Sequence, residues 1–493
     1  MDHKENGKKP AFNAGANNTS ESLLGKNNYI NMTEDLRKSS NTYSNILQDQ
    51  RHNSEMPSDM ALSPKSRRNF ADLMLSPVRF TQRKFRAGGT SGSIFSLVAA
   101  TLGAGTLTFG YAIKENGIAW GTFLIVFGAA ISYYTGMLLV HASNHTSRHR
   151  YEDIADALYG KKFARFTSIM NLLCLLAFIM SYIVYIKEAI PKIILIFAPT
   201  LDSFIVDPYW GQKFWGTIFS FCILFPMSLP RSINALRFSS AFGVLCSVYL
   251  CLAVTVIFWS DRGLVADPWE NFKEAEYFVF SFNGLVTSMP LIIFAYMYQV
   301  NIPLIYKELE RRNAKTMGKV LIRGSTAAIV LYAMVGIFCY MTFVKEPWVI
   351  TQNIFEAPYG SNVAIIVGQF TLFFAVMTAA PLCVLPAKDT VEELFYKKEG
   401  LSTKVNALVT LALVSICFLL SISIDKIGDA ITLAGATINP VIGFIIPVMF
   451  YWKVRSDLPA TSYQKVISLS VAIIIIIVSI MSLGNFIYLK IKS

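Results

Sequence analysis

The sequence predicts an all-α polytopic membrane protein in which a repeat of five plus five spans is followed by an eleventh. Of the 493 residues, 53% are hydrophobic and only 15% are charged, whereas soluble domains carry about 25% charged residues. Eleven apolar stretches follow one another, each near the length of about 20 residues that a helix needs to cross a bilayer. A buried core helix explains one such stretch but not eleven in series. The stretches are 93–113, 118–142, 165–187, 213–229, 239–260, 278–306, 318–344, 362–387, 405–424, 429–452 and 464–489.

A polar tail, residues 1–88, precedes the first span and contains no long apolar run. It is rich in Asn, Ser, Lys and Glu, a composition that cannot bury enough apolar surface to fold alone, so we expect it to be disordered. The basic stretch 65–86 contains only one acid, Asp72, which predicts association with anionic lipid headgroups. Ser63 and Ser76 each precede a proline and are predicted kinase sites, at which a phosphate would oppose the basic stretch.

The loops between the spans alternate in charge. Because inward loops of membrane proteins carry an excess of Lys and Arg, this alternation predicts a cytosolic tail and an outward Ser493. The outward loop 261–277 is rich in Asp and Glu instead. The sequence leaves open whether the membrane is the plasma membrane or a vacuolar or lysosomal membrane. Basic residues of the inward loops include Arg148, Arg150, Lys161, Lys162, Lys307, Arg311, Arg312 and Lys315.

The first span is predicted to break in its middle. Gly103 and Gly105 lie there one residue apart, and each glycine weakens a helix by about 1 kcal/mol relative to alanine. Backbone groups that are freed in mid-membrane survive only inside protein or against a wet cavity. The alternative is that these small residues only let neighbouring helices pack closely.

The sixth span is predicted to break at Pro290, which removes a donor and clashes with the preceding turn. The first and sixth spans begin the two halves of a five-plus-five repeat, whose halves run in opposite orientation because five is odd. Paired interrupted spans at corresponding places indicate the binding site of a secondary transporter. The ten-span core is predicted over 89–460, and the eleventh span with a short outward C-terminus over 461–493.

The two predicted breaks match a zwitterionic amino acid. Free N–H groups around Gly103, Ala104, Gly105 and Thr106 would face a carboxylate at a positive half-helix end. Unpaired carbonyl groups would accept the ammonium group. The span interiors lack charged residues, which favours a neutral substrate. The carbonyl candidates are those of Thr101, Leu102, Val286 and Thr287, and the side-chain candidates are Asn171, Cys174, Ser288, Tyr296 and Thr378.

Other classes of function receive less support. An amino acid sensor that signals through the tail stays open as the alternative to a carrier. An enzyme would need His, Cys or acids clustered at one depth, but the five histidines lie in the tail or on the loop side of spans, and the seven cysteines are spread over six spans. We therefore expect no enzyme activity, no metal or cofactor, no nucleic-acid partner and no disulfide framework. No dimer interface is evident, so a monomer is expected.

The residues around the breaks resemble the amino acid/auxin permease family. The resemblance covers 88–455, and it rests on the order and spacing of motifs that are individually weak. It implies a LeuT-type fold and amino acid transport by alternating access, driven by protons or sodium. The motifs include Gly103-Ala104-Gly105-Thr106-Leu107, Asn116-Gly117, Tyr151-Glu152-Asp153-Ile154, Ser181-Tyr182, Phe294-Ala295-Tyr296, Gly336-Ile337-Phe338, Pro381 and Pro386.

Departures from the family pattern bear on the coupling ion. Sodium-coupled members carry Asn four residues before the first motif glycine, where this chain has Ala99. They also carry hydroxyls at a place on the eighth span where this chain has Met377-Thr378-Ala379, with a single hydroxyl. We therefore expect proton coupling or exchange rather than sodium coupling. Gln299 stands where many members have a titratable His. The nearest acids, Glu188 and Asp429, are interpreted as solvated charges at the membrane interface.

Overall fold

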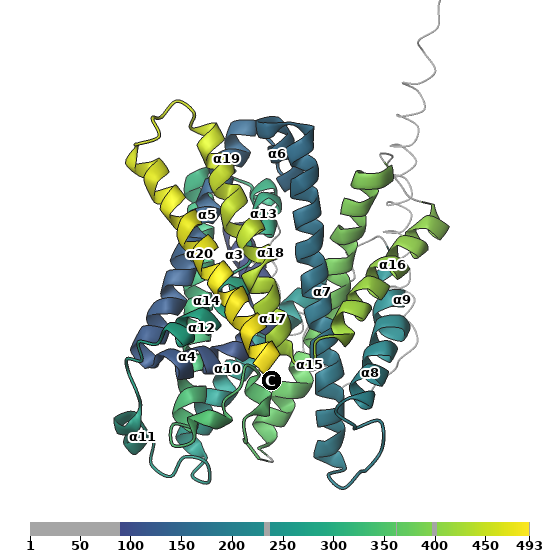
Figure 1. Ribbon diagram of the computed structural model, residues 1–493, viewed down its shortest axis with the longest axis vertical. Helices are drawn as coiled ribbons and strands as arrows, with labels where there is room; N and C mark the ends of the chain where they lie inside the picture. The colour runs from purple at the N-terminus through teal and green to yellow at the C-terminus, as the bar shows by residue number, and fades with distance from the viewer. Residues whose placement is uncertain (1–88, 231–236, 361, 397–401, 493) are drawn as a thin grey trace, which may run out of the picture. The chain divides into compact units, whose positions relative to one another are not determined.

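The computed structural model describes residues 89–230, 237–360, 362–396 and 402–492, and these residues form helices and connecting turns without any strand. Nine of the described helices are long and apolar enough to cross a membrane, and a bent pair at the start makes a tenth. The tail 1–88, with Ser63 and Ser76, lies outside the described residues. The helices stand side by side in a bundle (Figure 1).

Most spans are single long helices, and α7 and α15 stay continuous although they contain Pro191 and Pro381 with Pro386 respectively. Their faces are apolar nearly all round, as expected of helices that meet protein on one side and lipid on the other. These helices are α5 (Ile118–Thr146), α7 (Lys161–Phe197), α10 (Arg237–Ser260), α14 (Ala314–Thr342), α15 (Val363–Val391), α16 (Thr403–Ile422) and α20 (Tyr463–Lys492).

The fourth predicted span, 213–229, is not one regular helix. It is divided into α8 (Trp210–Thr217), a π-helical segment (Ile218–Leu224) and α9 (Phe225–Ser228). Pro226 has no N–H for the regular ladder, and the Phe225 N–H reaches back five residues to the Ser220 carbonyl. Among the residues that the structure describes, this is the one predicted span of the eleven that has neither a long apolar helix nor a bent pair of helices that makes one.

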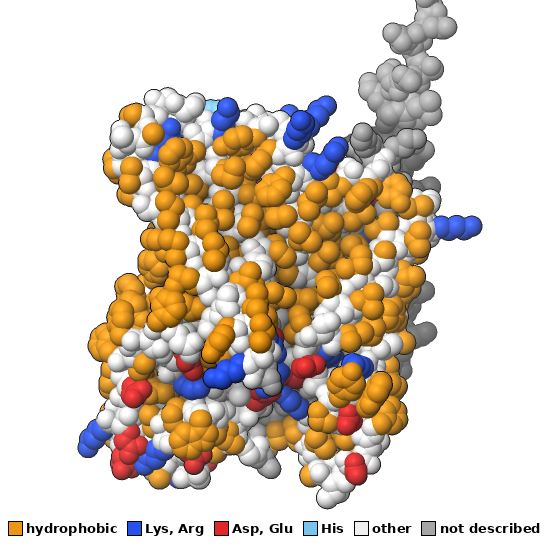
Figure 2. Space-filling view, in the orientation of Figure 1, with side chains coloured by type: hydrophobic (Ala, Val, Ile, Leu, Met, Phe, Trp, Pro, Cys, Tyr) orange, Lys and Arg blue, Asp and Glu red, His pale blue; other side chains and the backbone are white. Residues whose placement is uncertain are grey.

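Two ends of the bundle differ in charge. The α6 end carries α6 (Tyr151–Tyr159), and the α11 end carries α11 (Pro268–Glu274). Figure 2 shows Lys and Arg side chains along the α6 end of the face in view, whereas Asp and Glu side chains, with further Lys and Arg, lie toward the α11 end. The predicted cytosolic side corresponds to the α6 end.

The first span breaks where its glycines predict. Helix α3 (Thr90–Thr101) ends, a 3₁₀ segment η1 (Ala104–Thr108) follows, and α4 (Phe109–Asn116) continues the span. The two halves are bent by 54°. Gly103, at the corner, is extended with φ −168° and ψ −148°.

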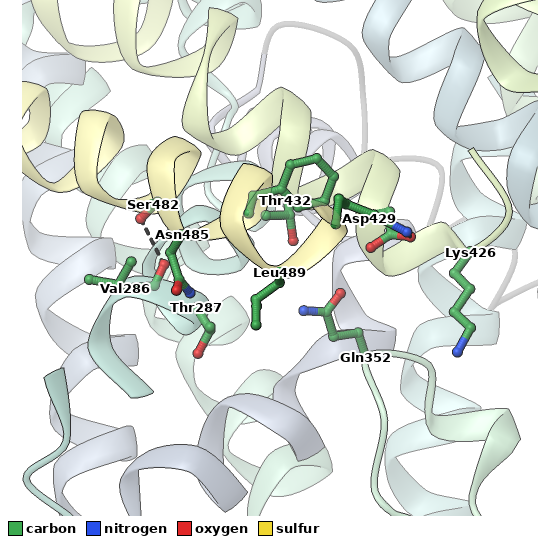
Figure 3. Close-up of a pocket in the computed structure, with 11 residues that line it drawn as sticks. Val286, Thr287, Gln352, Lys426, Asp429, Thr432, Ser482, Asn485 and Leu489 are labelled. Carbon is green, nitrogen blue, oxygen red and sulfur yellow. Dashed lines mark hydrogen bonds and ion pairs between the residues drawn. The ribbon is translucent and has the colours of Figure 1, made fainter. Parts of the chain in front are cut away.

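The sixth span breaks six residues later than predicted. Helix α12 (Phe282–Ala295) continues through Pro290 and ends at Ala295, and α13 (Ile302–Glu308) follows after a short 3₁₀ turn. Pro290 deprives the Val286 carbonyl of its helical donor. The Ser482 hydroxyl of α20 donates to that carbonyl at 2.7 Å (Figure 3). The prediction of a break at Pro290 was therefore wrong, because a neighbouring helix satisfies the carbonyl group.

Removing the Ser482 hydroxyl is expected to destabilise the protein by about 1 kcal/mol, the usual scale for a hydrogen bond between membrane helices. The change Ser482→Ala should lower the melting temperature in detergent. In a Pro290→Ala background, the restored Ala N–H bonds to Val286, and the same change should cost almost nothing. An equal loss in both backgrounds would show that Ser482 stabilises the protein by other means.

A third interruption was not predicted from the sequence. The tenth span consists of α17 (Ile427–Ala436), α18 (Ile438–Pro440), a π-helical segment (Val441–Ile445) and α19 (Ile446–Val454). The Asn439-Pro440 dipeptide is a local sequence signal of this break. Helix α17 packs on α12 so closely that a Cβ on Gly435 would lie 2.0 Å from the Pro290 carbonyl oxygen.

Candidate functional site

The broken ends of the first and sixth spans meet each other. A Cβ on Gly105 would lie 2.9 Å from the Ala295 Cβ and 3.0 Å from the Ala295 Cα. Only glycine leaves room for this approach. The sequence-predicted site residues of the first span therefore lie directly against the end of α12.

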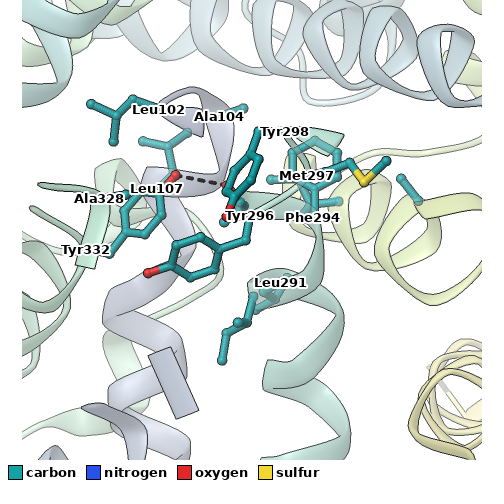
Figure 4. Packing of buried hydrophobic residues seen from close by; sticks show 14 of the residues in the cluster. Leu102, Ala104, Leu107, Leu291, Phe294, Tyr296, Met297, Tyr298, Ala328 and Tyr332 are labelled. Carbon is teal, nitrogen blue, oxygen red and sulfur yellow. Dashed lines mark hydrogen bonds between the residues drawn. The ribbon is translucent and has the colours of Figure 1, made fainter. Parts of the chain in front are cut away.

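Tyr332 of α14 holds the two broken ends together. Its hydroxyl lies 2.7 Å from the Thr101 carbonyl oxygen and 3.1 Å from the Ala295 carbonyl oxygen. Both carbonyls lie in the last turn of a half-helix, where the regular N–H donor is missing. The fully buried Tyr332 ring stacks on Phe109 at 4.1 Å between centroids. It meets the Tyr296 ring edge-on, with 5.4 Å between centroids (Figure 4).

The N–H groups at the corner of the first span are unpaired. Those of Gly103, Ala104 and Gly105 have no hydrogen-bond acceptor among the residues that the structure describes. Gly103 borders open space, since a Cβ there would meet no heavy atom within 4 Å. N–H groups at the start of a helical segment attract anions, so this corner can receive a carboxylate.

Comparison with known proteins identifies the family. The model of the family described as "Transmembrane amino acid transporter protein" matches residues 86–490. The chain belongs to this family. The resemblance seen in the sequence is thereby confirmed, and the chain is a member of a transporter family and not an enzyme.

A curated relative and a solved structure extend the comparison. The "Sodium-coupled neutral amino acid symporter 2" of Danio rerio is 24% identical over 422 residues, which cover 80% of this chain and 82% of the relative. The crystal structure of MhsT in complex with L-phenylalanine superimposes with a TM-score of 0.53 at 14% identity, covering 80% of this chain and 98% of MhsT. The transporter thus has the LeuT-type fold that the resemblance implied.

Three predicted site residues on α12 of the transporter already have hydrogen-bond partners within the protein. Ser288 is fully buried, and its Oγ accepts a hydrogen bond from Asn116 Nδ2 at 2.8 Å, which joins α12 to α4. The Thr287 hydroxyl donates to the Asn283 carbonyl of its own helix at 2.8 Å. The Val286 carbonyl, predicted to accept an ammonium group, is the partner of Ser482.

Residues of α7 face the third interruption. Cys174 Sγ lies 3.5 Å from Asn439 Oδ1. Asn171 Oδ1 and Asn439 Nδ2 are buried with no hydrogen-bond partner among the described residues. Asn171 and Cys174 were predicted from the sequence, but Asn439 was not. Asn439 belongs to the tenth span, so this span also contributes to the polar groups beside α7.

The remaining predicted residues lie as follows. Leu102 and Thr106 are buried at the first break, and Tyr296 is buried at the second. Thr378 lies on α15, where its hydroxyl donates to the Phe374 carbonyl one turn earlier at 3.0 Å. Gln299 is fully buried, and its Nε2 lies 3.3 Å from Thr135 Oγ1.

A cavity of about 250 Å³ opens at the α11 end between α12, α17 and α20 (Figure 3). Asp429 of its wall pairs with Lys490 at 2.7 Å, so this acid is not the solvated charge that the sequence analysis predicted. The residues that line the cavity are Val286, Thr287, Gln352, Lys426, Asp429, Thr432, Ser482, Asn485, Phe486, Leu489 and Lys490.

The prediction that Glu188 is a solvated charge at the membrane interface was also wrong. Its side chain is only 3% exposed, and it accepts hydrogen bonds from Lys192, Asn353 and the Ile427 N–H. The sequence could not indicate these partners, because two of them lie more than 160 positions away.

Proposed function

We propose that this protein is a secondary transporter that moves neutral amino acids across a membrane by alternating access. One observation carries the proposal: the unpaired N–H groups of residues 103–105 lie beside the half-helix carbonyls of Thr101 and Ala295. This arrangement offers partial positive charge to a carboxylate and partial negative charge to an ammonium group.

The absence of charged residues in the chain around the two breaks favours a substrate with a neutral side chain. Residues 99–109 and 291–299 contain no charged side chain. The zebrafish relative, whose printed name specifies neutral amino acids, supports the same substrate class. The ammonium group would share the Thr101 and Ala295 carbonyls with the Tyr332 hydroxyl, since each carbonyl oxygen has two lone pairs.

For the coupling ion, we propose protons or exchange rather than sodium. A sodium ion needs several oxygen ligands, and the Ala99 side chain contributes none. The printed name of the zebrafish relative favours sodium instead. A measurement with separate pH and sodium gradients therefore decides between the two.

We further propose that the α6 end faces the cytosol together with the tail, because Lys and Arg gather there. The membrane is then the plasma membrane or a vacuolar or lysosomal membrane, and the transporter works as a monomer. Phosphorylation of Ser63 and Ser76 would weaken binding of the tail to anionic lipid.

Uptake of labelled amino acids into proteoliposomes tests the proposed function. We expect neutral amino acids to accumulate with an imposed pH gradient, or to exchange with internal amino acid, and sodium to have no effect. Strict sodium dependence would overturn the proposed coupling. Binding without flux of any amino acid would overturn the carrier and favour the sensor.

A further inference from the structure

Glu188 joins three parts of the chain at the α11 end. It lies on α7, and its Oε1 accepts hydrogen bonds from Lys192 Nζ at 2.8 Å and from Asn353 Nδ2 at 2.7 Å. Its Oε2 accepts the backbone N–H of Ile427 at 2.8 Å. Lys192 belongs to the same helix, Asn353 to the loop residues 343–360 that follow α14, and Ile427 is the first residue of α17.

The same loop makes a second ionic contact. Lys192 also binds Glu356 Oε1 at 2.8 Å, and the Thr351 hydroxyl donates to Glu356 Oε2 at 2.6 Å. Burial raises the pKa of Glu356, but the Lys192 ammonium and these hydrogen bonds outweigh it and hold the pKa below its usual value. Glu356 is therefore ionised at neutral pH. Lys192 thus ties the loop to α7 through two carboxylates.

The loop also packs closely against the start of α17. A Cβ on Gly428 would lie 2.1 Å from Gln352 Oε1. Further along the same helix, Gly435 lies against the Pro290 carbonyl of α12, five residues before that helix ends at Ala295. The position of α17 is therefore linked mechanically to the broken end at which we place the substrate.

We propose that the Glu188 carboxylate is a latch that closes the α11 end by holding the loop residues 343–360 and the start of α17 against α7. The inference rests on the proposed function, because alternating access requires one end of the transporter to close while the other opens. Glu188 acts through the elements that it holds, so it is a positioning residue.

A charged latch suits a reversible closure. When the latch is closed, three donors and the positive N-terminal end of α17 satisfy the buried carboxylate. When it opens, water solvates the same carboxylate and its partners, which offsets the lost hydrogen bonds. The net difference between the two states stays small, whereas breaking an apolar contact of similar size has no such compensation from water.

Cysteine labelling in the full-length protein tests the latch. Ile427→Cys places a thiol at a fully buried position beside Glu188, and Cys222→Ser removes the native cysteine that is exposed. In this background, Glu188→Gln replaces the anion by an amide whose NH₂ faces other donors. We expect the labelling rate at position 427 by a membrane-impermeant maleimide to rise about tenfold or more.

Two further variants complete the test. Glu346→Gln removes an exposed carboxylate from the same loop and should leave labelling unchanged. Asn353→Ala removes one loop donor while the Lys192 pair remains, and it should raise labelling by a smaller factor, which keeps the test valid if Glu188→Gln fails to fold. Unchanged labelling in Asn353→Ala, and in Glu188→Gln where it folds, would overturn the latch. Raised labelling in a protein that transports no amino acid would uphold the latch and overturn the proposed function.

Discussion

Uptake is expected to be lost in Gly103→Leu although the protein still folds. The backbone at Gly103 is extended, a conformation open to any residue, and a Cβ there meets no neighbouring atom within 4 Å. A leucine side chain would therefore fill the open space beside the unpaired N–H groups of residues 103–105. We expect uptake of every amino acid in the panel to fall to background, with an unchanged melting temperature in detergent.

Substitutions at two other glycines serve as controls for Gly103→Leu. Gly484 of α20 also borders open space, so Gly484→Leu should leave both folding and uptake near the wild-type level. Gly105→Leu should instead reduce the amount of folded protein, since its Cβ has no room beside Ala295. Substantial uptake by well-folded Gly103→Leu would place the substrate away from the corner of the first span.

The second large effect is expected from Tyr332→Phe, which removes only the hydroxyl that bridges Thr101 and Ala295. The phenylalanine ring keeps the stacking on Phe109, but the one hydroxyl proton that two buried carbonyl groups share is lost. Leaving a buried acceptor unsatisfied costs about 1–3 kcal/mol. We expect a lower melting temperature and, because both broken ends are then misplaced, a fall of about tenfold or more in the initial rate of uptake, equivalent to about 1.4 kcal/mol.

Tyr340→Phe is the matched control on the same helix. The Tyr340 hydroxyl is also buried and accepts the Glu276 N–H at 3.1 Å, but it lies on α14 two turns beyond Tyr332. This variant should lose a similar amount of stability and retain uptake. Equal losses of uptake in the two variants would show that Tyr332 contributes only to general stability.

These variants separate two regions of the transporter. Tyr332 and Gly103 act at the broken ends, whereas Glu188 acts at the α11 end through α17. Helix α17 connects them, because Gly435 contacts Pro290 and Ile427 contacts Glu188. A substrate that shifts the end of α12 would therefore also shift α17 and change its contact with Glu188. Labelling at position 427 that depends on substrate would report this coupling.

The membrane class, the positions of most spans and the break in the first span followed from the sequence alone. These properties depend on local composition: the length of an apolar run decides whether it can span a bilayer, and Gly103 and Gly105 weaken their own helix. The family resemblance rested on short motifs whose order and spacing can be read directly along the chain. The fourth span departed from prediction because a π-helical segment, which ends just before Pro226, interrupts the regular helix.

Only the tertiary structure decided where the sixth span breaks and what the polar groups contact. Pro290 was expected to end α12, but the hydroxyl of Ser482, 196 positions from Val286, satisfies the Val286 carbonyl group that the proline leaves free. Tyr332 is 231 positions from Thr101, and Glu188 is 239 positions from Ile427. Apolar periodicity identifies the buried face of a helix, but it does not identify the hydrogen-bond partner of a polar group on that face. The partners of buried polar groups depend on how the helices pack, and the site and the latch are built from such partners.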